Sequence, residues 1–318
     1  MLTYNLIKNN LDLSKKIYIA FSGGPDSTAL LHLISKMKTD FEIEPQAIHI
    51  NHNLSNQSGK WAEHCKNICM SLDIDLLTES IEIRSKGGGI ESAARQSRYK
   101  IFTNILKKGE QIALAHHSDD VAETILMRML RGTGIDGLEG PKLKRNLGAG
   151  ILIRPFLNIS KKEILSYLNE NKLNYINDDS NKDNSFDRNF LRNKIFPLLE
   201  DRWNNFPQRF TNMSSIIRDR NSNYSDLLFE IHHELIGKEI EIKKLKEVSR
   251  TIIYDILRYS IKKCNIAVPN RKIMDEILKT FIDSKPGPKS IVTWSRADRE
   301  EDAGKITYKK GILVISKK

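Results

Sequence analysis

The chain has 318 residues and a mass of 36.5 kDa, more than one small core usually organises, so its length favours two domains. Hydrophobic residues make up 39% and charged residues 29%, an ordinary globular composition that excludes a fibrous or disordered chain. No apolar run is long enough to cross a membrane and the first residues lack a signal-peptide core, so we expect no membrane association and a cytoplasmic location. Three cysteines are too few for a disulfide framework or a four-cysteine zinc site.

The formal net charge of +11 is unevenly distributed along the chain. Residues 1–187 carry +1 and residues 188–318 carry +10. A nearly neutral part followed by a basic part suggests a catalytic or ligand-binding domain joined to a surface that meets a polyanion such as RNA. The alternative is a solvated, lysine-rich surface.

The first half of the chain alternates short apolar runs with amphipathic stretches. The runs are rich in Ile and Ala, and we expect them to be buried strands: Lys16–Phe21, Gln46–Ile50, Ile74–Ile83 and Gln111–His116. Between them, apolar residues recur every three or four positions, which predicts four helices: Ser27–Met37, Gly59–Leu72, Ile90–Lys107 and Asp119–Leu130. This alternation predicts an α/β fold with a parallel sheet covered on both faces and ligands at the carboxyl ends of its strands.

The second half changes character. Ile151–Leu157 predicts one more strand, and Ser160 with Glu163 predicts a capping box that opens a helix reaching about Asn169. From about Arg188 the pattern becomes mainly helical, and the tail has β-branched runs broken by glycines, which predicts a small terminal sheet. We therefore expect a catalytic domain over residues 1–215 and a helical, basic domain over residues 216–318.

The strongest motif lies between the first predicted strand and the first predicted helix. It consists of Ser22, Gly23, Gly24, Pro25, Asp26 and Ser27. Two glycines let backbone N–H groups approach a ligand, the helix N-terminus favours negative charge, and Asp26 could hold Mg²⁺ beside phosphates. The alternative for an isolated Ser-Gly-Gly is a plain turn. Neither G-x-x-x-x-G-K-[ST] nor G-x-G-x-x-G occurs, so neither a P-loop NTPase nor a dinucleotide-binding protein is supported.

This loop resembles that of the PP-loop family of ATP pyrophosphatases, which have an adenine nucleotide alpha hydrolase-like fold. In that family the loop binds ATP, and pyrophosphate is released after a substrate oxygen is adenylated. Further segments, in order and spacing, are similar to those of the tRNA(Ile)-lysidine synthases: His49–Leu54, Glu91–Tyr99, Ala115–Thr124, Arg131–Gly134, Asp179–Asn181 and Arg188–Arg192. Val121 departs from the pattern, because many members carry Gln there.

The resemblance implies a ligase that uses ATP and Mg²⁺. ATP would adenylate the wobble cytidine of an isoleucine tRNA with a CAU anticodon, and the ε-amino group of free L-lysine would then displace AMP to give lysidine. The basic C-terminal part would bind the tRNA, and a homodimer is left open.

Site residues follow from the loop and from this resemblance. We expect Asp26, His116, Asp120 and Arg192 to be catalytic, with Asp26 on the metal. Asp120 and Glu123 lie three apart on a helix and would hold lysine, while Arg95 and Arg188 would contact anionic parts of the substrates. The alternatives are helix capping by Asp119 and Asp120, salt bridges from Arg188 and Arg192 to Asp183 or Asp187, and a surface position for Arg95.

Two other functions compete with this one. A thiolase-like PP-loop enzyme would be expected to carry a CxxC pair, and none occurs in the sequence. A non-catalytic nucleotide- or RNA-binding protein would keep the phosphate loop without needing paired acids for lysine.

Overall fold

The computed structural model describes residues 2–52, 58–81, 90–295 and 302–318, with the backbone alone for residues 90–92. Asn53, Leu54 and Ile83, which belong to segments named above, lie outside these ranges. The chain divides into two compact units: unit 1 is Met1–Gly132 with Gly137–Ser215, and unit 2 is Thr133–Asp136 with Ile216–Lys318. Within the described ranges, every helix is too short or too polar to span a lipid bilayer.

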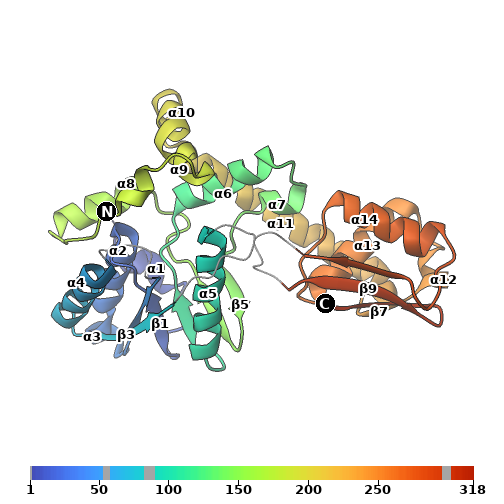
Figure 1. Cartoon of the computed structure of the whole chain (residues 1–318), viewed down its shortest axis with the longest axis horizontal. Coiled ribbons are helices and arrows are strands. Elements are labelled where there is room, and N and C mark those ends of the chain that lie inside the picture. Colours follow the sequence, from blue (N-terminus) through green and yellow to red (C-terminus); the bar gives the residue numbers. More distant parts are fainter. Residues whose placement is uncertain (1, 53–57, 82–89, 296–301) are drawn as a thin grey trace. The chain divides into compact units, whose positions relative to one another are not determined.

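Unit 1 is built on a six-stranded sheet in the order β3-β2-β1-β4-β6-β5. Its strands are β1 (Ile17–Ala20), β2 (Gln46–Asn51), β3 (Asp75–Ser80), β4 (Gln111–Ala113), β5 (Lys144–Leu147) and β6 (Gly150–Ile153). Strands β1, β3 and β5 of this sheet are labelled in Figure 1. All neighbours are parallel except β5, which runs antiparallel to β6. The predicted parallel α/β sheet is confirmed. We did not predict β5, because its Lys-Arg-Asn-Leu sequence is that of a polar edge strand.

Helices cover both faces of this sheet, as predicted. Ile17 and Ile19 of β1 share one buried cluster with α2 (Pro25–Ser35), α3 (Met37–Phe41), α4 (Ser58–Ser71) and α8 (Lys161–Glu170). Tyr18 points to the opposite face and packs with Phe102 and Leu106, from α5 (Ile90–Ile105) and the residue after it. Because side chains alternate along a strand, one short apolar run supplies core residues to both faces of the sheet. A site can then form at the ends of the strands.

The chain that follows β4 carries the histidine pair. β4 ends at Ala113, so it is shorter than the predicted strand 111–116, although Leu114 still donates its N–H to the carbonyl of Ile153 at 2.9 Å. His116 and His117 therefore lie in the connection between β4 and α6 (Ser118–Leu130). The remaining elements up to residue 232 are α1 (Asn5–Lys8), α7 (Ile135–Leu138), η1 (Asp179–Lys182), α9 (Asp187–Phe190), η2 (Leu191–Ile195), α10 (Phe196–Arg202) and α11 (Phe206–His232).

Unit 2 combines helices with a four-stranded antiparallel sheet in the order β7-β10-β9-β8. Beyond α11, its elements are η3 (His233–Leu235), β7 (Glu239–Glu241), α12 (Ile242–Leu245), α13 (Arg250–Lys263), α14 (Arg271–Leu278), η4 (Lys279–Asp283), β8 (Ile291–Trp294), β9 (Gly304–Lys309) and β10 (Ile312–Lys317). In its core, α13 and α14 pack against the sheet through side chains such as Ile256, Ile277, Ile306 and Leu313. The predicted helical region with a small terminal sheet is confirmed, and the three-residue β7 is an addition.

Candidate active site

The glycine loop occupies the end of β1 and opens α2. Gly23 has φ +80°, a conformation that favours glycine, and a Cβ there would lie 2.6 Å from Ile176 Cδ1 and 2.9 Å from Cys65 Sγ. The carbonyl of Gly23 also accepts a hydrogen bond from the N–H of Ile176 at 2.8 Å. Gly24 is the N-cap of α2 and Pro25 is its first residue. Gly23 is therefore needed for both its backbone angle and the close packing beneath the loop.

The two serines of the loop have different surroundings. Ser27 is buried, and its hydroxyl donates to the carbonyl of Gly24 at 3.0 Å while accepting from the N–H of Ser22 at 3.2 Å. Ser22 is exposed, and its Oγ lies 3.1 Å from that of Ser27. Ser27 thus holds the loop in shape, while Ser22 stays exposed beside the N-terminus of α2. A helix N-terminus of this kind has the charge and the donors for a phosphate.

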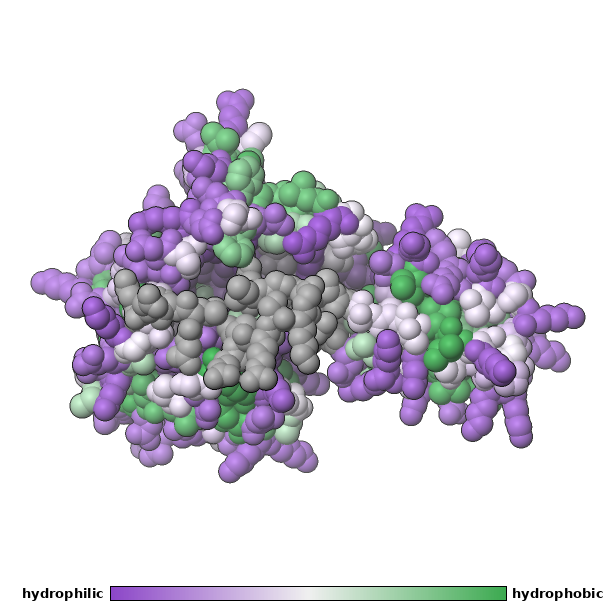
Figure 2. All heavy atoms as spheres, in the orientation of Figure 1, coloured by the Kyte–Doolittle hydropathy of each residue, from purple (hydrophilic) through white to green (hydrophobic). Residues whose placement is uncertain are grey.

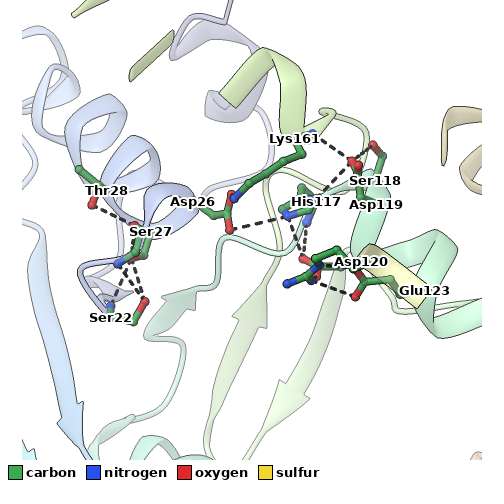
Figure 3. A network of polar contacts seen from close by, with 12 residues as sticks. Ser22, Asp26, Ser27, Thr28, His117, Ser118, Asp119, Asp120, Glu123 and Lys161 are labelled. Atoms are coloured by element: carbon green, nitrogen blue, oxygen red, sulfur yellow. Dashed lines mark hydrogen bonds and ion pairs between the residues drawn. The ribbon is translucent and has the colours of Figure 1, made fainter. Parts of the chain in front are cut away.

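Asp26 stands at this helix N-terminus between two cationic side chains. Its Oδ1 lies 2.5 Å from Lys161 Nζ, and its Oδ2 lies 3.7 Å from His117 Nε2 (Figure 3). Burial would raise the pKa of Asp26, but the hydrogen bonds and positive charges of His117 and Lys161 outweigh burial, so its pKa is lowered. Asp26 is therefore an ionised carboxylate at neutral pH.

His117 is the buried centre of the polar network. Its ring faces Asp26, Asp119 at 3.4 Å and Asp120 at 3.5 Å, and its side chain is 4% exposed. Burial by itself would lower the pKa of His117, but the charge of Asp120 and the hydrogen bonds that His117 donates to Asp119 and Asp26 raise it to about 10. His117 is a fixed cation, and it joins the glycine loop to the acids of α6.

His116, its neighbour, has the opposite protonation state. Burial lowers its pKa well below 6.5, and the charges of Arg154, Arg95 and Arg188 add to this, against the raising effect of Asp120. Arg154 Nε donates to His116 Nδ1 at 3.2 Å. Because Arg is only a donor, Nδ1 carries no proton and the neutral ring keeps its proton on Nε2. His116 therefore offers an N–H donor, which suits an oxygen of a phosphate or a base.

Asp120 and Glu123 share one face of α6, as predicted, and both meet arginines from the segment Arg188–Arg192. Glu123 is fully buried; its two oxygens accept from Arg192 Nε at 2.7 Å and from Arg188 Nε at 2.5 Å. Asp120 Oδ1 accepts from Arg188 Nη2 at 3.2 Å and from Arg192 Nη2 at 3.4 Å. Burial would raise the pKa of Asp120, but His117 and Arg188 lower it strongly. The two predicted lysine-binding acids are thus paired with Arg188, predicted to contact an anionic substrate, and with Arg192, predicted to be catalytic.

The alternatives left open above receive distinct answers. Asp120 does cap α6, because its Oδ2 accepts from the N–H of His117 at 3.0 Å while Oδ1 faces the arginines. Asp119 instead accepts the N–H of Lys161 at 2.9 Å and so ties α6 to α8. Asp187 pairs with Arg131 at 3.5 Å, whereas Arg188 turns inward. Capping and membership of the network therefore coexist at Asp120.

Arg95 extends the site from α5. Its Nη2 donates to the hydroxyl of Tyr99 at 3.3 Å, and its guanidinium stacks over the Tyr99 ring. Its positive charge also contributes to the lowered pKa of His116, so Arg95 lies near enough to act on that ring. The structure thus brings all the predicted site residues into one region of unit 1.

A divalent metal fits this site only together with phosphates. Among the described residues, no group of three or more His, Cys, Asp or Glu side chains could hold a metal ion by itself. Mg²⁺ is commonly bound by one or two carboxylates with phosphate oxygens and waters, and Asp26 supplies one ionised carboxylate at the phosphate loop. The donor set therefore suits magnesium carried with a nucleotide.

Three important residues were not among the predicted site residues. From the sequence, His117 is equally well explained as a packed and hydrogen-bonded histidine. Lys161 lies inside the predicted capping box, directly after the N-cap Ser160, and this position by itself indicates only a helix start. Arg154 is almost fully buried, bonded to His116 and to the carbonyl of Lys142. An arginine directly after the apolar run Ile151–Ile153 was a usable signal, because burying such a residue requires partners.

Comparison with known proteins gives consistent matches. The chain is 33% identical over 284 residues to a tRNA(Ile)-lysidine synthase of Legionella pneumophila (strain Lens), covering 89% of this chain and 65% of that protein. It is 39% identical over 227 residues to the enzyme of the same name from Photorhabdus laumondii, covering 71% of this chain and 51% of that protein. The predicted resemblance is confirmed, although the chain spans about 65% of the length of the first of these relatives.

A solved structure has a similar fold, and a family model identifies the family of the chain. A U34-tRNA thiolase from Methanococcus maripaludis superposes with a TM-score of 0.56 at 15% identity, covering 68% of this chain and 77% of that one, which is a likeness of fold alone. The PP-loop domain model matches residues 3–199, more than half of the chain and nearly all of unit 1. With its glycine loop on β1 and its parallel sheet, the chain belongs to the PP-loop family.

Proposed function

We propose that this protein is a tRNA(Ile)-lysidine synthase, a ligase that joins free L-lysine to the wobble cytidine of an isoleucine tRNA with a CAU anticodon. The observation that carries the proposal is the network that runs from Asp26 through His117 to Asp120. It links the glycine loop, which follows β1, to the acids of α6, which follows the adjacent strand β4. The similarity to lysidine synthases over 89% of the chain supports the same activity.

The first half-reaction needs a triphosphate held at the glycine loop. The 2-carbonyl oxygen of the cytidine attacks the α-phosphorus of ATP, the bond from that phosphorus to the bridging oxygen breaks, and pyrophosphate leaves. The exposed Ser22 and the N-terminal N–H groups of α2 would hold phosphate oxygens. Magnesium, when bound with ATP beside Asp26, would neutralise charge on the departing pyrophosphate. His116 is suited to donate a hydrogen bond from its Nε2–H to an oxygen at the reacting phosphorus.

The second half-reaction needs lysine beside the adenylated cytidine. The ε-amino nitrogen attacks C2, the C2–oxygen bond to AMP breaks, and a proton passes to solvent. We assign recognition of lysine to Asp120 and Glu123. Because both acids are paired with Arg188 and Arg192, an incoming ammonium group would replace part of these contacts. The released guanidinium groups of Arg188 and Arg192 would then be available for the adenylate or the anticodon phosphates.

A thiolase-like activity is less well supported. All three cysteines lie among the described residues and are free of disulfides. Burial, with a smaller effect of Cys69, raises the pKa of Cys65 to about 12, and burial raises the pKa of Cys69 to about 12. Thiols with such pKa values are poor nucleophiles at neutral pH. The paired acids and arginines, by contrast, have an evident use in a lysine-dependent reaction.

One assay tests the proposal against its competitors. The protein is incubated with ATP, magnesium, labelled lysine and unmodified isoleucine tRNA carrying the CAU anticodon. We expect label in the tRNA, with AMP and pyrophosphate released in equal amounts, and no label without ATP. Pyrophosphate release that continues through many turnovers without lysine would favour another PP-loop enzyme. Binding of ATP and RNA with no turnover would favour a non-catalytic protein. A cytoplasmic location and a homodimer stay predictions.

A further inference from the structure

A lysine from far along the sequence stands at the phosphate loop. The glycine loop itself contains no lysine of the kind that P-loop proteins place against phosphates. Lys161, 135 residues after Asp26, brings its Nζ to 2.5 Å from Asp26 Oδ1 (Figure 3). Asp26 is the second residue of α2, so the ammonium group lies at the helix end where phosphates would bind. The fold thus supplies a cation that the loop sequence lacks.

The backbone of Lys161 is fixed from several sides. It is the first residue of α8, whose N-cap Ser160 forms a capping box with Glu163. Its own N–H donates to Asp119 Oδ2 at 2.9 Å, which joins it to α6. α8 shares the buried core with α2, and Tyr167 of α8 hydrogen-bonds His32 of α2 at 2.7 Å. The position of the ammonium group is therefore set by rigid elements rather than by a loose surface chain.

The pair of Lys161 and Asp26 is able to open. The two side chains are 31% and 28% exposed, and a pair exposed to this degree contributes little to folding stability. An ammonium group has three donors on a flexible stem, so it can turn from a carboxylate to a nearby phosphate oxygen. Asp26 would keep His117 as a cationic neighbour after such a turn. The arrangement suits an ion pair between Lys161 and Asp26 that persists until a phosphate ligand binds.

We propose that Lys161 is a catalytic residue that moves from Asp26 to the pyrophosphate end of bound ATP and neutralises the charge that develops as pyrophosphate leaves. This role rests on the proposed function, because it assumes cleavage between the α- and β-phosphates. Asp26, freed on its Oδ1 side, then becomes available for the magnesium ion that accompanies ATP. Lys161 thereby acts where a lysine of the phosphate loop acts in P-loop proteins.

The experiment compares Lys161→Met with Lys162→Met. The two variants lose the same charge one position apart, but Lys162 is exposed to solvent. Calorimetry in the presence of magnesium measures the affinities for ATP, inorganic pyrophosphate and AMP. We expect Lys161→Met to weaken ATP and pyrophosphate binding about 10- to 100-fold, the usual range for a lost charged hydrogen bond, and to leave AMP within about twofold. Lys162→Met should match the wild type for all three ligands.

Turnover provides the second readout. Lys161→Met should release pyrophosphate about 100-fold more slowly, and Lys161→Arg should recover part of both affinity and rate. ATP affinity unchanged in Lys161→Met, or AMP weakened as much as ATP, would overturn the proposal. A thermal unfolding midpoint like that of the wild type ensures that these losses are local, and Lys161→Arg serves if Lys161→Met does not fold. If the wild type itself neither binds ATP nor releases pyrophosphate, the proposed function fails before this role is tested.

Discussion

The two units place their charges differently. In unit 1, Glu123, Glu139, Arg154 and the protonated His117 are buried. Among the described residues of unit 2, the buried polar side chain is the uncharged Ser260. The ion pairs of unit 2 are partly or largely exposed, for example Arg258 with Asp136 at 20% and 34% and Arg250 with Asp283 at 56% and 42%. The side of unit 2 visible in Figure 2 is accordingly mostly hydrophilic. Charge is built into the interior of one unit and spread over the surface of the other.

This difference separates two uses of charge. Burying an ion pair costs desolvation energy that its attraction only partly offsets, so apolar side chains would often stabilise a core equally well. The network centred on His117 holds four acids, and four cations when His117 itself is counted, and it is therefore better explained by chemistry than by stability. They alternate in sign from Lys161 and Asp26 through His117 and Asp120 to Arg188. Exposed lysines, by contrast, suit screened, salt-dependent contact with a polyanion.

The prediction with the largest expected effect concerns Asp26 in the glycine loop and tests whether the two units have separate roles. Asp26→Ala removes the carboxylate between Lys161 and His117 and should abolish pyrophosphate release, with a loss of at least about 1000-fold. Its affinity for tRNA should stay within about twofold of the wild type, because we assign tRNA binding to the basic residues 188–318. Filter binding and a pyrophosphate assay check the two halves. A collapse of tRNA binding in a folded variant would show that this division of roles is wrong.

Much of this architecture could be predicted from periodicity. Runs such as Gln46–Ile50 are apolar because both faces of the sheet are covered. This pattern can be recognised in the sequence without any knowledge of tertiary contacts. The strands β5 and β7 escaped prediction because edge strands of three or four polar residues carry little pattern. The capping box at Ser160 was predicted, since the chemistry of a cap is local.

The sequence predicted which residues belong to the site better than it predicted the contacts between them. Asp120 and Glu123 were found from their spacing on a helix, and the loop from its glycines. That Arg188 and Arg192 neutralise those acids depends on contacts across 65 residues or more, which no local pattern encodes. The different protonation states of His116, which is neutral, and His117, which is cationic, likewise depend on neighbours from α2, α6 and the residue after β6. Tertiary contacts, rather than residue type, decide protonation here.

The histidine pair gives the next largest effect. The folded-state pKa of His117, about 10, lies above its ordinary value of 6.5, so folding strengthens proton binding. Its contribution to stability is therefore complete below pH 6.5 and is lost as the pH rises through 10, with an upper bound of about 5 kcal/mol. NMR titration of the imidazoles should find His117 charged at pH 8 and His116 neutral at pH 6. His117→Gln should flatten the fall of unfolding free energy between pH 7 and 9.5.

A pair of acid-to-amide substitutions compares the units directly. Glu123→Gln leaves Arg188 and Arg192 without their buried charge partner and should lower the free energy of unfolding of unit 1 by about 3 kcal/mol. Asp283→Asn breaks the exposed pair with Arg250 in unit 2 and should cost less than about 1 kcal/mol. Urea unfolding followed by circular dichroism measures both. Equal losses would remove the distinction between buried and surface charge.

The smallest expected effect concerns the surface lysines. Lys243, Lys246 and Lys310 are exposed in unit 2, and changing all three to Glu should flatten the salt dependence of tRNA binding by up to about 0.9 per lost phosphate contact. The matched control changes three exposed lysines of unit 1, Lys100, Lys107 and Lys108, and should leave the slope unchanged. Because counterion release depends on phosphate contacts and not on net charge, equal slopes in both variants would assign the excess charge of unit 2 to solubility. A slope altered by the control instead would place the tRNA on unit 1.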